Sequence, residues 1–450
     1  MTPAARIQAA IELLGEIAGS AAPAERAVGA YTRARRYMGA KDRRAIADLV
    51  YGMLRRQARL DWWLARVGVE AQPRATAIAY LTLVEGREPA ALATQFDGSR
   101  YGPSPIDEAE GALAAALAGQ ALDCAEQPDW VRAEVPDWLW GEVARGFGAD
   151  ARAEAAALAA EAPVDLRVNT LKASRADAAA ALAAAGIEAA PTPLSPVGLR
   201  VAGRRNVTGT APFRDGWVEV QDEGSQIVAL LVGARPGMAV ADVCAGGGGK
   251  ALALAATMEN RGRLLALDVD QARLDRAAPR LARAGASLVE RRMLGADDDL
   301  AGEARAFDRV LVDAPCSGSG AWRRAPDARW RLDGDRLAAY HAAQGQALAR
   351  AALLPRPGGR LVYATCSILP SENERAVSAF LAGHPDFAAV PGADAWRAAL
   401  AAAPPEGTIT EDGWIALTPH RHGTDGFFVA VMERAGTDTP RNEPCPSRPK

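Results

Sequence analysis

The sequence contains few of the features that mark a disulfide-bonded, secreted or membrane-embedded protein. Its 450 residues include five scattered cysteines, too few and too irregularly spaced for a disulfide scaffold, so a reducing cytoplasm is expected. No stretch reaches the roughly 18 uninterrupted apolar residues that a membrane-spanning helix needs. The first residues, MTPAARIQAA, lack the basic and then apolar layout of a secretory signal. These absences predict a cytoplasmic protein with no membrane association.

Lysine and net charge are also scarce. The 52 basic residues nearly balance 55 acidic ones, so the net charge of −3 gives no global sign of a nucleic-acid partner. Such a partner must be recognised from local clusters of charge. Four of the 52 basic residues are lysines, which leaves 52 − 4 = 48 arginines, and this scarcity draws attention to each lysine: Lys41, Lys172, Lys250 and Lys450.

Length and composition predict a globular protein of several domains. Hydrophobic residues make up 49% and charged residues 24%, which are ordinary values, and 450 residues rarely share one hydrophobic core. Apolar residues recur at helical spacing near the N-terminus, whereas further along the chain apolar runs alternate with helical stretches, as in a mostly parallel sheet. We expect a helical domain over 1–127, a small α+β module over 128–215, a βα domain over 216–433 and a disordered tail over 434–450.

The strongest local pattern is a glycine-rich turn between an apolar strand and an apolar helix, Asp242 to Lys250 (DVCAGGGGK). Glycines let the backbone turn sharply and approach a ligand closely. Asp268 ends the next apolar run, where an acid suits ribose hydroxyls. The phosphate-loop signature is not satisfied, because Ala251 follows Lys250. Oxidoreductases and methyltransferases share this layout, so the turn alone leaves both open.

Two cysteine motifs follow two later apolar strands. Cys316 lies in Asp313-Ala-Pro-Cys-Ser, and Cys366 lies in Thr365-Cys-Ser. Ligands bind at the carboxyl edge of such sheets, so a pair of cysteines there indicates chemistry rather than packing. A metal site is not expected, because the chain has no CxxC motif and its four histidines lie far from both cysteines in sequence.

These motifs resemble the RNA cytosine-5 methyltransferases with two cysteines, the NOL1/NOP2/Sun family, including its bacterial RsmB-type ribosomal RNA members. The resemblance spans about 128–433, and the region around Lys41 to Gly52 is similar to the NusB-like RNA-binding domain in front of the bacterial members. Besides the glycine loop and the two cysteine motifs, it includes Leu166 to Lys172 (LRVNTLK), Val220 to Ser225 (VQDEGS), Trp322 to Arg324 with Pro326-Asp327, and Asp425 to Phe428 (DGFF).

The resemblance implies a fold and a function. The expected fold is a class I S-adenosylmethionine-dependent methyltransferase, Rossmann-like, preceded by the α+β module and a helical NusB-like domain. The expected activity is methylation of cytosine carbon 5 in RNA, with small-subunit ribosomal RNA favoured and transfer RNA as an alternative. S-adenosylmethionine is the expected cofactor and RNA the expected partner, and the enzyme is expected to be a monomer.

The resemblance also assigns roles to residues. Cys366 would attack carbon 6 of cytosine, Cys316 would help to release the product, and Asp313 would hydrogen-bond the cytosine edge, with Lys250 in the same site. The cofactor would lie along the glycine loop with Asp268 on its ribose, and Asp313 borders this site too. The expected cofactor-binding residues are Cys244, Ala245, Gly246, Gly247, Gly248, Gly249, Lys250, Asp268 and Asp313.

Two departures from the family pattern keep other functions open. Gly247 stands where the family usually has proline, and the acid that would meet the adenine cannot be identified in Val289 to Leu294. A catalytically weak RNA-binding assembly factor is therefore an alternative. A dinucleotide oxidoreductase is a more distant one, since its pattern does not explain the paired cysteines.

Two arginine-rich clusters are candidates for RNA contact, because arginine with aromatic residues suits splayed bases and phosphates. We expect the second cluster to border the active site, since it follows the first cysteine motif. The first cluster consists of Arg33, Arg35, Arg36, Lys41, Arg43 and Arg44, and the second of Arg323, Arg324, Arg329 and Arg331 with Trp322 and Trp330.

Overall fold

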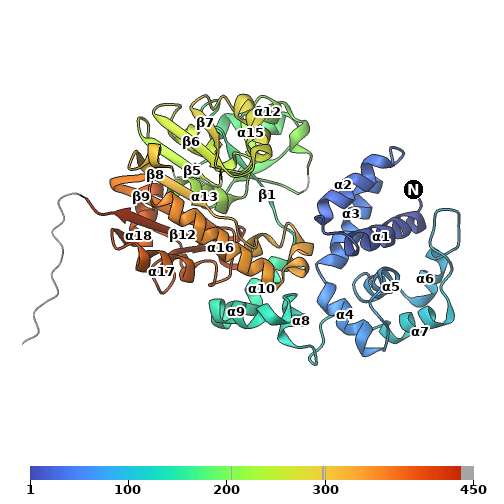
Figure 1. Cartoon of the computed structure of the whole chain (residues 1–450). Coiled ribbons are helices and arrows are strands. Elements are labelled where there is room, and N and C mark those ends of the chain that lie inside the picture. Colours follow the sequence, from blue (N-terminus) through green and yellow to red (C-terminus); the bar gives the residue numbers. More distant parts are fainter. Residues whose placement is uncertain (204, 296–297, 299, 437–450) are drawn as a thin grey trace, which may run out of the picture. The chain divides into compact units, whose positions relative to one another are not determined.

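The chain divides into two compact units, which are described one at a time. The computed structural model describes residues 1–436 except 204, 296, 297 and 299, so the predicted disordered tail, 434–450, lies outside the described residues from 437 onward. Its first residue, Arg434, was wrongly placed in the tail, because it is buried at the end of the last strand, Phe427–Arg434. The first unit combines Met1–Ala162 with Gly318–Gly334, and the second contains the rest of the chain (Figure 1). No helix in the described part of the chain is long and apolar enough to cross a membrane.

The first unit is helical, as its periodicity predicts. Its helices begin where the sequence offers caps: the Thr2 side chain accepts the Ala5 N–H before the first helix, and Asp107 forms a capping box with Glu110. The apolar faces of the helices between Pro3 and Leu117, including Leu13, Ile46 and Ile78, share one core. The helices are α1 (Pro3–Ala18), α2 (Ala24–Ala34), α3 (Ala40–Leu54), α4 (Gln57–Arg66), α5 (Pro73–Leu83), α6 (Pro89–Gln95), α7 (Glu108–Leu117), α8 (Asp129–Ala133), α9 (Asp137–Phe147) and α10 (Ala151–Ala159).

A segment far along the chain completes this helical unit. Gly318–Gly334 forms two short 3₁₀ helices, η4 (Ser319–Ala321) and η5 (Pro326–Arg331). The Trp322 side chain is fully buried, and Asp327 accepts the Ala24 N–H at 2.9 Å, which satisfies a donor at the start of α2. The residues after the first cysteine motif thus contribute to the core of the N-terminal unit.

The second unit begins with a small antiparallel sheet in the order β2-β3-β1-β4. The predicted strand at 166–170 is β1, and the predicted alanine-rich helix is α11, which begins at a Ser174 capping box. Leu166, Leu182 and Leu199 pack in its core. The elements are β1 (Val164–Val168), α11 (Arg175–Ala184), β2 (Ala189–Pro191), β3 (Gly198–Val201), α12 (Ala211–Arg214) and β4 (Val218–Val220).

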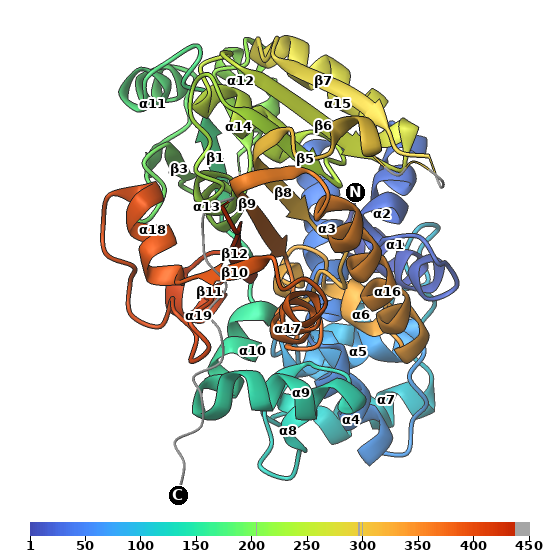
Figure 2. The same cartoon turned by 60° about the vertical axis from the view of Figure 1, so that its left-hand side comes forward.

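The second unit continues into an eight-stranded sheet, in which β10-β12-β9-β8-β5-β6-β7 lie side by side and β11 pairs with β12 (Figure 2). The five strands β7, β6, β5, β8 and β9 run parallel, and β12 runs antiparallel to β9. The strands are β5 (Ala239–Val243), β6 (Arg263–Asp268), β7 (Val289–Met293), β8 (Phe307–Asp313), β9 (Pro355–Thr365), β10 (Phe387–Val390), β11 (Ile415–Leu417) and β12 (Phe427–Arg434).

Helices cover both faces of this sheet, as the repeated βα pattern predicts. Because strand side chains alternate, Val240 and Leu311 pack with α13, α14, α15 and α18, whereas Ala241 and Val310 pack with α16 and α17. The helices are α13 (Glu223–Leu231), α14 (Gly249–Thr257), α15 (Gln271–Ala284), α16 (Gly334–Ala351), α17 (Glu374–Gly383), α18 (Gly392–Leu400) and α19 (Pro419–His422).

Candidate active site

The three predicted motifs follow three neighbouring strands. The chain runs outward from β5 to β7 on one side and from β8 to β9 on the other, so the strand order reverses between β5 and β8. Ligands bind in the crevice at the carboxyl ends of the strands at such a point. The glycine loop leaves β5, the Asp313 motif ends β8, and the Cys366 motif ends β9. The sheet topology therefore brings the motifs to one edge.

The two cysteines of these motifs lie in contact. The Sγ atoms of Cys316 and Cys366 are 3.4 Å apart, although the residues are separated by 50 positions in sequence. Both are half-buried and neither forms a disulfide. In the register of β8 and β9, Asp313 lies opposite Ala364, and the Ala314 N–H donates to the Ala364 carbonyl at 2.9 Å. This pairing of the strand ends holds the two cysteine loops side by side.

Lys250 and Asp313 form an ion pair in the same site. The Lys250 Nζ lies 2.6 Å from Asp313 Oδ2, and the lysine is 9% exposed. Burial lowers the pKa of Lys250, but the attraction and hydrogen bond of Asp313 outweigh it, so the pKa lies above its usual value. The lysine therefore stays charged at neutral pH. Its Nζ atom lies 5.7 Å from the centre of the Phe427 ring, within range of a cation–π interaction.

The glycine loop has the backbone conformation of a ligand cradle. Cys244, Gly246 and Gly248 have positive φ angles, and a Cβ at Gly248 would come within 3.0 Å of Ala277 Cβ. Asp268 ends β6, where its carboxylate accepts the Gly246 N–H at 2.7 Å. Burial raises the pKa of Cys244 to about 12, so its thiol stays protonated. This places Cys244 in the loop as a neutral residue.

Two of the upstream motifs hold the backbone of this loop through hydrogen bonds. The buried Arg167 of the LRVNTLK motif donates to the Gly249 carbonyl at 2.8 Å and also to the Gln221 side chain of the VQDEGS motif. Arg280 donates to the Gly247 carbonyl at 2.6 Å. The flexible glycines are therefore fixed by arginines from β1 and α15, and Arg280 holds the position at which the related family usually has proline.

Asp242 begins the glycine-loop motif but was not among the expected site residues, and its carboxyl group lacks the partners that Asp268 and Asp313 have. It is fully buried, and neither carboxylate oxygen has a hydrogen-bond partner among the residues that the structure describes. Burial and then the neighbouring Asp313 charge raise its pKa to about 8. With Asp268 and Asp313 nearby, this edge suits a cationic ligand such as the sulfonium and ammonium groups of S-adenosylmethionine. A dinucleotide pyrophosphate would instead meet acidic side chains, so the residues fit the methyl donor.

A second residue that the sequence reasoning missed is Glu372. It is completely buried and accepts the Ser317 backbone N–H at 2.8 Å and the Gln344 side-chain amide at 3.1 Å. The hydroxyls of Ser317 and Ser367 donate to the same carboxylate. The sequence signal was a polar Ser-Glu-Asn stretch five residues after Cys366, which is unusual for a buried segment.

The second arginine cluster does not have the environment that was expected of it. Arg329 is fully buried in the helical unit, where it donates to the carbonyls of Glu134 at 2.7 Å and Leu158 at 3.0 Å. Trp322 and Arg323 are buried too, whereas Arg324 is exposed. Most of this cluster therefore stabilises the helical unit and is not available to RNA phosphates. Composition alone could not distinguish these two uses of arginine.

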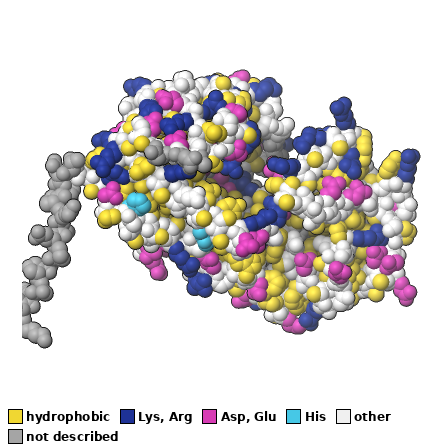
Figure 3. All heavy atoms as spheres, viewed as in Figure 1, with side chains coloured by type: hydrophobic (Ala, Val, Ile, Leu, Met, Phe, Trp, Pro, Cys, Tyr) yellow, Lys and Arg dark blue, Asp and Glu magenta, His cyan; other side chains and the backbone are white. Residues whose placement is uncertain are grey.

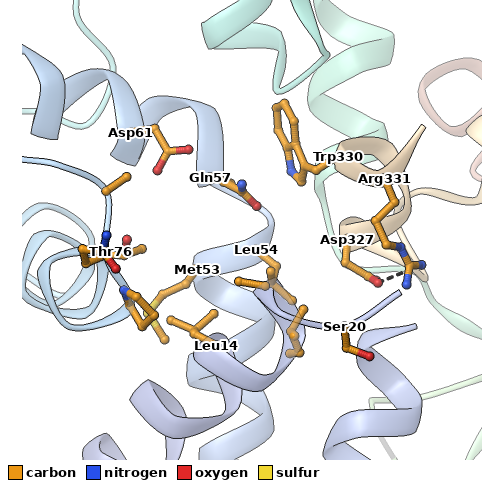
Figure 4. A pocket seen from close by; sticks show the side chains of 15 residues that line it. Leu14, Ser20, Met53, Leu54, Gln57, Asp61, Thr76, Asp327, Trp330 and Arg331 are labelled. Carbon is orange, nitrogen blue, oxygen red and sulfur yellow. Dashed lines mark ion pairs between the residues drawn. The ribbon is translucent and has the colours of Figure 1, made fainter. Parts of the chain in front are cut away.

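Arg331 and Trp330 of this cluster line a cavity of about 420 Å³ within the helical unit. Arg331 pairs with Asp327 at 2.9 Å, as the dashed line in Figure 4 marks, and Leu14 and Met53 form part of the apolar wall. Burial raises the pKa of Asp61, which also lines the cavity, to about 6. This arginine is therefore engaged in an intramolecular ion pair.

The first arginine cluster is largely exposed. Arg33, Arg36 and Lys41 are exposed at the end of α2 and the start of α3, and Tyr37 between them is 70% exposed. Arg35 instead stacks over the Tyr31 ring at 3.4 Å. On the face that Figure 3 shows, Lys and Arg are interspersed with Asp and Glu over the sheet-containing unit, in keeping with the small net charge.

Comparisons with known proteins agree with this geometry. Residues 229–433 match the family model described as 16S rRNA methyltransferase RsmB/F, and residues 135–208 match the ferredoxin-like domain of RsmF/B-like methyltransferases. A probable ribosomal RNA small subunit methyltransferase B of Synechocystis sp. is 31% identical over 425 residues, covering 88% of this chain and 92% of the relative. A Bacillus subtilis relative of the same name is 34% identical over 60% of each chain.

Solved structures give the same result. The crystal structure of PH0851 superposes with a TM-score of 0.76 at 28% identity, covering 96% of this chain and 99% of that one. A methyltransferase homologue from Pyrococcus horikoshii has a TM-score of 0.57, covering 68% and 97%. The fold is that of a class I methyltransferase with a ferredoxin-like domain, and its cofactor is S-adenosylmethionine. The chain belongs to the RsmB/F family of 16S rRNA methyltransferases.

Proposed function

We propose that the protein methylates carbon 5 of a cytosine in small-subunit ribosomal RNA through a covalent cysteine adduct. The observation that carries this proposal is the contact between Cys316 and Cys366, 3.4 Å apart at the carboxyl edge of the sheet. Methylation of an oxygen or an exocyclic nitrogen needs no thiol, because those atoms are nucleophiles themselves. Carbon 5 of cytosine is a poor nucleophile and becomes one only when a nucleophile adds to carbon 6.

In this mechanism Cys366 is the nucleophile. Its thiolate forms a bond to carbon 6, and the electron pair of the carbon 5–carbon 6 double bond moves to carbon 5. S-adenosylmethionine supplies the methyl group that carbon 5 accepts. A base then takes the proton from carbon 5, the double bond between carbon 5 and carbon 6 forms again, and the electron pair of the bond between sulfur and carbon 6 returns to the Cys366 sulfur as a thiolate. Cys316, in contact with Cys366, assists this last step.

Asp313 and Lys250 would stabilise the base during addition. Negative charge develops on the pyrimidine ring when the thiolate adds, and fixed charges in a site with little water stabilise such charge strongly. The buried Lys250 ammonium, 2.6 Å from Asp313, supplies a positive charge that the carboxylate keeps oriented. Asp313, at the end of β8 in the same motif as Cys316, is the acceptor for the cytosine amino group.

For the cofactor we propose the residues of the glycine loop, Cys244 to Lys250, with Asp268 on the ribose and Asp313 at the border of the site. Asp242 is added to this set because its buried carboxylate has no partner in the described part of the chain. A positively charged ligand at that position would offset the cost of burying it. Support for the loop comes from Arg167 and Arg280, which hold its carbonyls.

RNA would be bound in part by the exposed basic residues at the end of α2, in the connection after it and at the start of α3. Arg33, Arg36 and Lys41 offer phosphate contacts, and Tyr37 offers a ring on which an unpaired base can stack. We propose that residues 1–127 form a NusB-like RNA-binding domain, followed by the α+β module at 128–215 and the catalytic domain at 216–433.

The target base must leave its stack to reach the thiols. We propose further that the enzyme is a monomer and acts in the cytoplasm.

Two cysteine variants test the proposal. Cys366→Ala should abolish methyl transfer to small-subunit RNA, whereas Cys316→Ala should accumulate a covalent protein–RNA complex that survives denaturing electrophoresis. Cys124→Ala, in the helical unit, is the matched control and should keep the wild-type rate. Full activity of Cys366→Ala would refute the covalent mechanism.

Bisulfite sequencing of total RNA from a deletion strain would identify the substrate. Loss of one 5-methylcytosine in small-subunit ribosomal RNA supports the proposal, and loss in transfer RNA would favour the alternative substrate. Calorimetry with S-adenosylmethionine tests the remaining alternative, an assembly factor with weak catalysis. Absence of detectable binding would favour that role and contradict ours.

A further inference from the structure

The carboxylate of Glu372 joins the two cysteine loops. It accepts the backbone N–H and the hydroxyl of Ser317, the residue after Cys316. It also accepts the hydroxyl of Ser367, the residue after Cys366. One buried side chain thus binds the residue that follows each thiol, although the two loops leave different strands.

The backbone around Glu372 is itself fixed. The Tyr363 hydroxyl donates to the Glu372 carbonyl at 2.6 Å, and the Asn373 side chain donates to the Ser367 carbonyl at 3.0 Å. Thr365, directly before Cys366, donates from its hydroxyl to Asn373 at 2.6 Å. The carboxylate therefore has little freedom to follow either loop, and the loops must instead conform to it.

Burying a carboxylate that has no cationic side chain among its hydrogen-bond partners, as far as the chain is described, carries a large desolvation cost. Such a group is kept only when several donors satisfy it, and here two hydroxyls, one backbone N–H and the Gln344 amide do so. Apolar side chains in place of both the carboxylate and its side-chain donors would fill the same space with less cost. The arrangement is thus better explained by a requirement for the connection itself than by a contribution to core packing.

We propose that Glu372 is a positioning residue that sets the separation of the two thiols by holding both cysteine loops. This inference rests on the proposed function for its catalytic meaning, because two thiols that act in successive steps on one base must reach it without rearrangement. Beyond the strand ends no backbone ladder continues between the loops, so side-chain bonds must keep the spacing. Glu372 supplies three of them.

The thiol spacing can be measured without RNA or cofactor. Exchange with oxidised glutathione converts the two thiols of Cys316 and Cys366 to a disulfide and releases two molecules of reduced glutathione. The equilibrium constant gives the effective concentration of one thiol at the other, which falls steeply as the sulfurs separate or become mobile. Mass spectrometry of the linked peptides reports this pair apart from the other three cysteines, Cys124, Cys244 and Cys445. Failure of the proposed RNA chemistry would leave this measurement unaffected.

Glu372→Ala should lower the effective concentration at least tenfold, and Glu372→Asp, too short to reach both loops, should lower it by an intermediate amount. Glu411→Gln removes an exposed carboxylate of the same unit and should leave it within twofold of wild type. Affinity for S-adenosylmethionine should change less than twofold in every variant, because the glycine loop has separate supports. An effective concentration within twofold of wild type in a folded Glu372→Ala protein would overturn the proposal.

A second variant tests the proposal even if Glu372→Ala fails to fold. The double change Ser317→Ala and Ser367→Ala removes both hydroxyl donors and keeps the acid, and it should also lower the effective concentration severalfold. In methyl transfer, these variants should lose kcat with little change in KM for RNA, as expected of misplaced thiols. A rise in KM at unchanged kcat would instead indicate a role in binding and contradict the positioning role.

Discussion

The two arginine clusters of the helical unit differ in environment although their compositions are alike. Arg33, Arg36 and Lys41 extend into solvent beside the exposed Tyr37. Arg329 is buried next to Trp322, with its guanidinium 5.2 Å from the centre of that ring, and donates to two backbone carbonyls. Both clusters combine arginine with aromatic residues, and only one of them is free to meet a polyanion.

The difference shows how burial determines what a charged side chain does. A buried guanidinium is stable only when its donors are used, so Arg329 joins α8, α10 and η5, and burial lowers its pKa to about 10. An exposed guanidinium stays hydrated and contributes little to the free energy of unfolding. It can instead bind an RNA phosphate and release the counterions held there. Changes in the buried cluster should therefore lower stability, and changes in the exposed cluster should weaken RNA binding.

The largest expected effect is on stability. Arg329→Met leaves two buried carbonyls without a donor and should cost about 3 kcal/mol in the free energy of unfolding. The salt dependence of RNA binding by the folded variant should stay as in wild type. Urea titration followed by tryptophan fluorescence measures the first quantity. Arg324→Met, a change at an exposed residue of the same segment, should stay within about 0.5 kcal/mol of wild type.

Asp242 extends the comparison, because it is buried like Arg329, but its carboxylate has no hydrogen-bond partner in the described part of the chain. Its pKa rises to about 8 in the folded protein, so the unfolded chain releases the proton at a lower pH than the folded one. Stability attributable to this group is therefore highest below pH 4 and is lost as the pH rises towards 8. Asp242→Asn should remove about 2.6 kcal/mol of the difference in unfolding free energy between pH 5 and pH 7. An unchanged pH profile would show that Asp242 is ionised in the folded protein.

The exposed cluster should affect RNA binding and not stability. Changing Arg33, Arg36 and Lys41 together to Gln should weaken binding to small-subunit RNA about tenfold at physiological salt and reduce the slope of log K against log salt by about 2. Filter binding at several salt concentrations measures both. The unfolding free energy should stay within about 0.5 kcal/mol of wild type, and a larger loss would mean that the cluster is structural after all.

The smallest effect is expected at an exposed ion pair. Arg44 lies 3.7 Å from Asp48 on α3, and both side chains are more than half exposed. Arg44→Ala should change the unfolding free energy by less than about 0.5 kcal/mol, since solvent screens such pairs. Thermal unfolding of wild type and variant at low and high salt tests this. If Arg44→Ala lowered the free energy of unfolding about as much as Arg329→Met, the exposed cluster would be structural and would not differ from the buried one.

Much of the fold was predictable because its patterns are local. Helical spacing predicted the N-terminal helices, and apolar runs separated by helical stretches predicted β5, β6, β8 and β9. The path of Gly318–Gly334 into the helical unit was not predictable, since it depends on contacts with α2, α8 and α10 that are distant in sequence. The same path explains why the second arginine cluster was misread as an RNA surface.

For the candidate site, motifs at strand ends predicted that Cys316 and Cys366 would meet, because the ends of parallel strands share one edge. Glu372, Asp242 and Arg280 were not predicted as site residues. Glu372 and Asp242 matter through burial, and Arg280 through a bond to the Gly247 carbonyl. No spacing rule relates these residues to the motifs that they support.

The sequence by itself determined the helical and βα character of the two regions, the glycine loop and the two cysteine motifs, since each depends on neighbours within a few residues. Only the tertiary structure decided which charges are buried, that Lys250 pairs with Asp313, and that one carboxylate holds both cysteine loops. The physical reason is that desolvation and hydrogen-bond partners depend on residues that come together only when the chain folds.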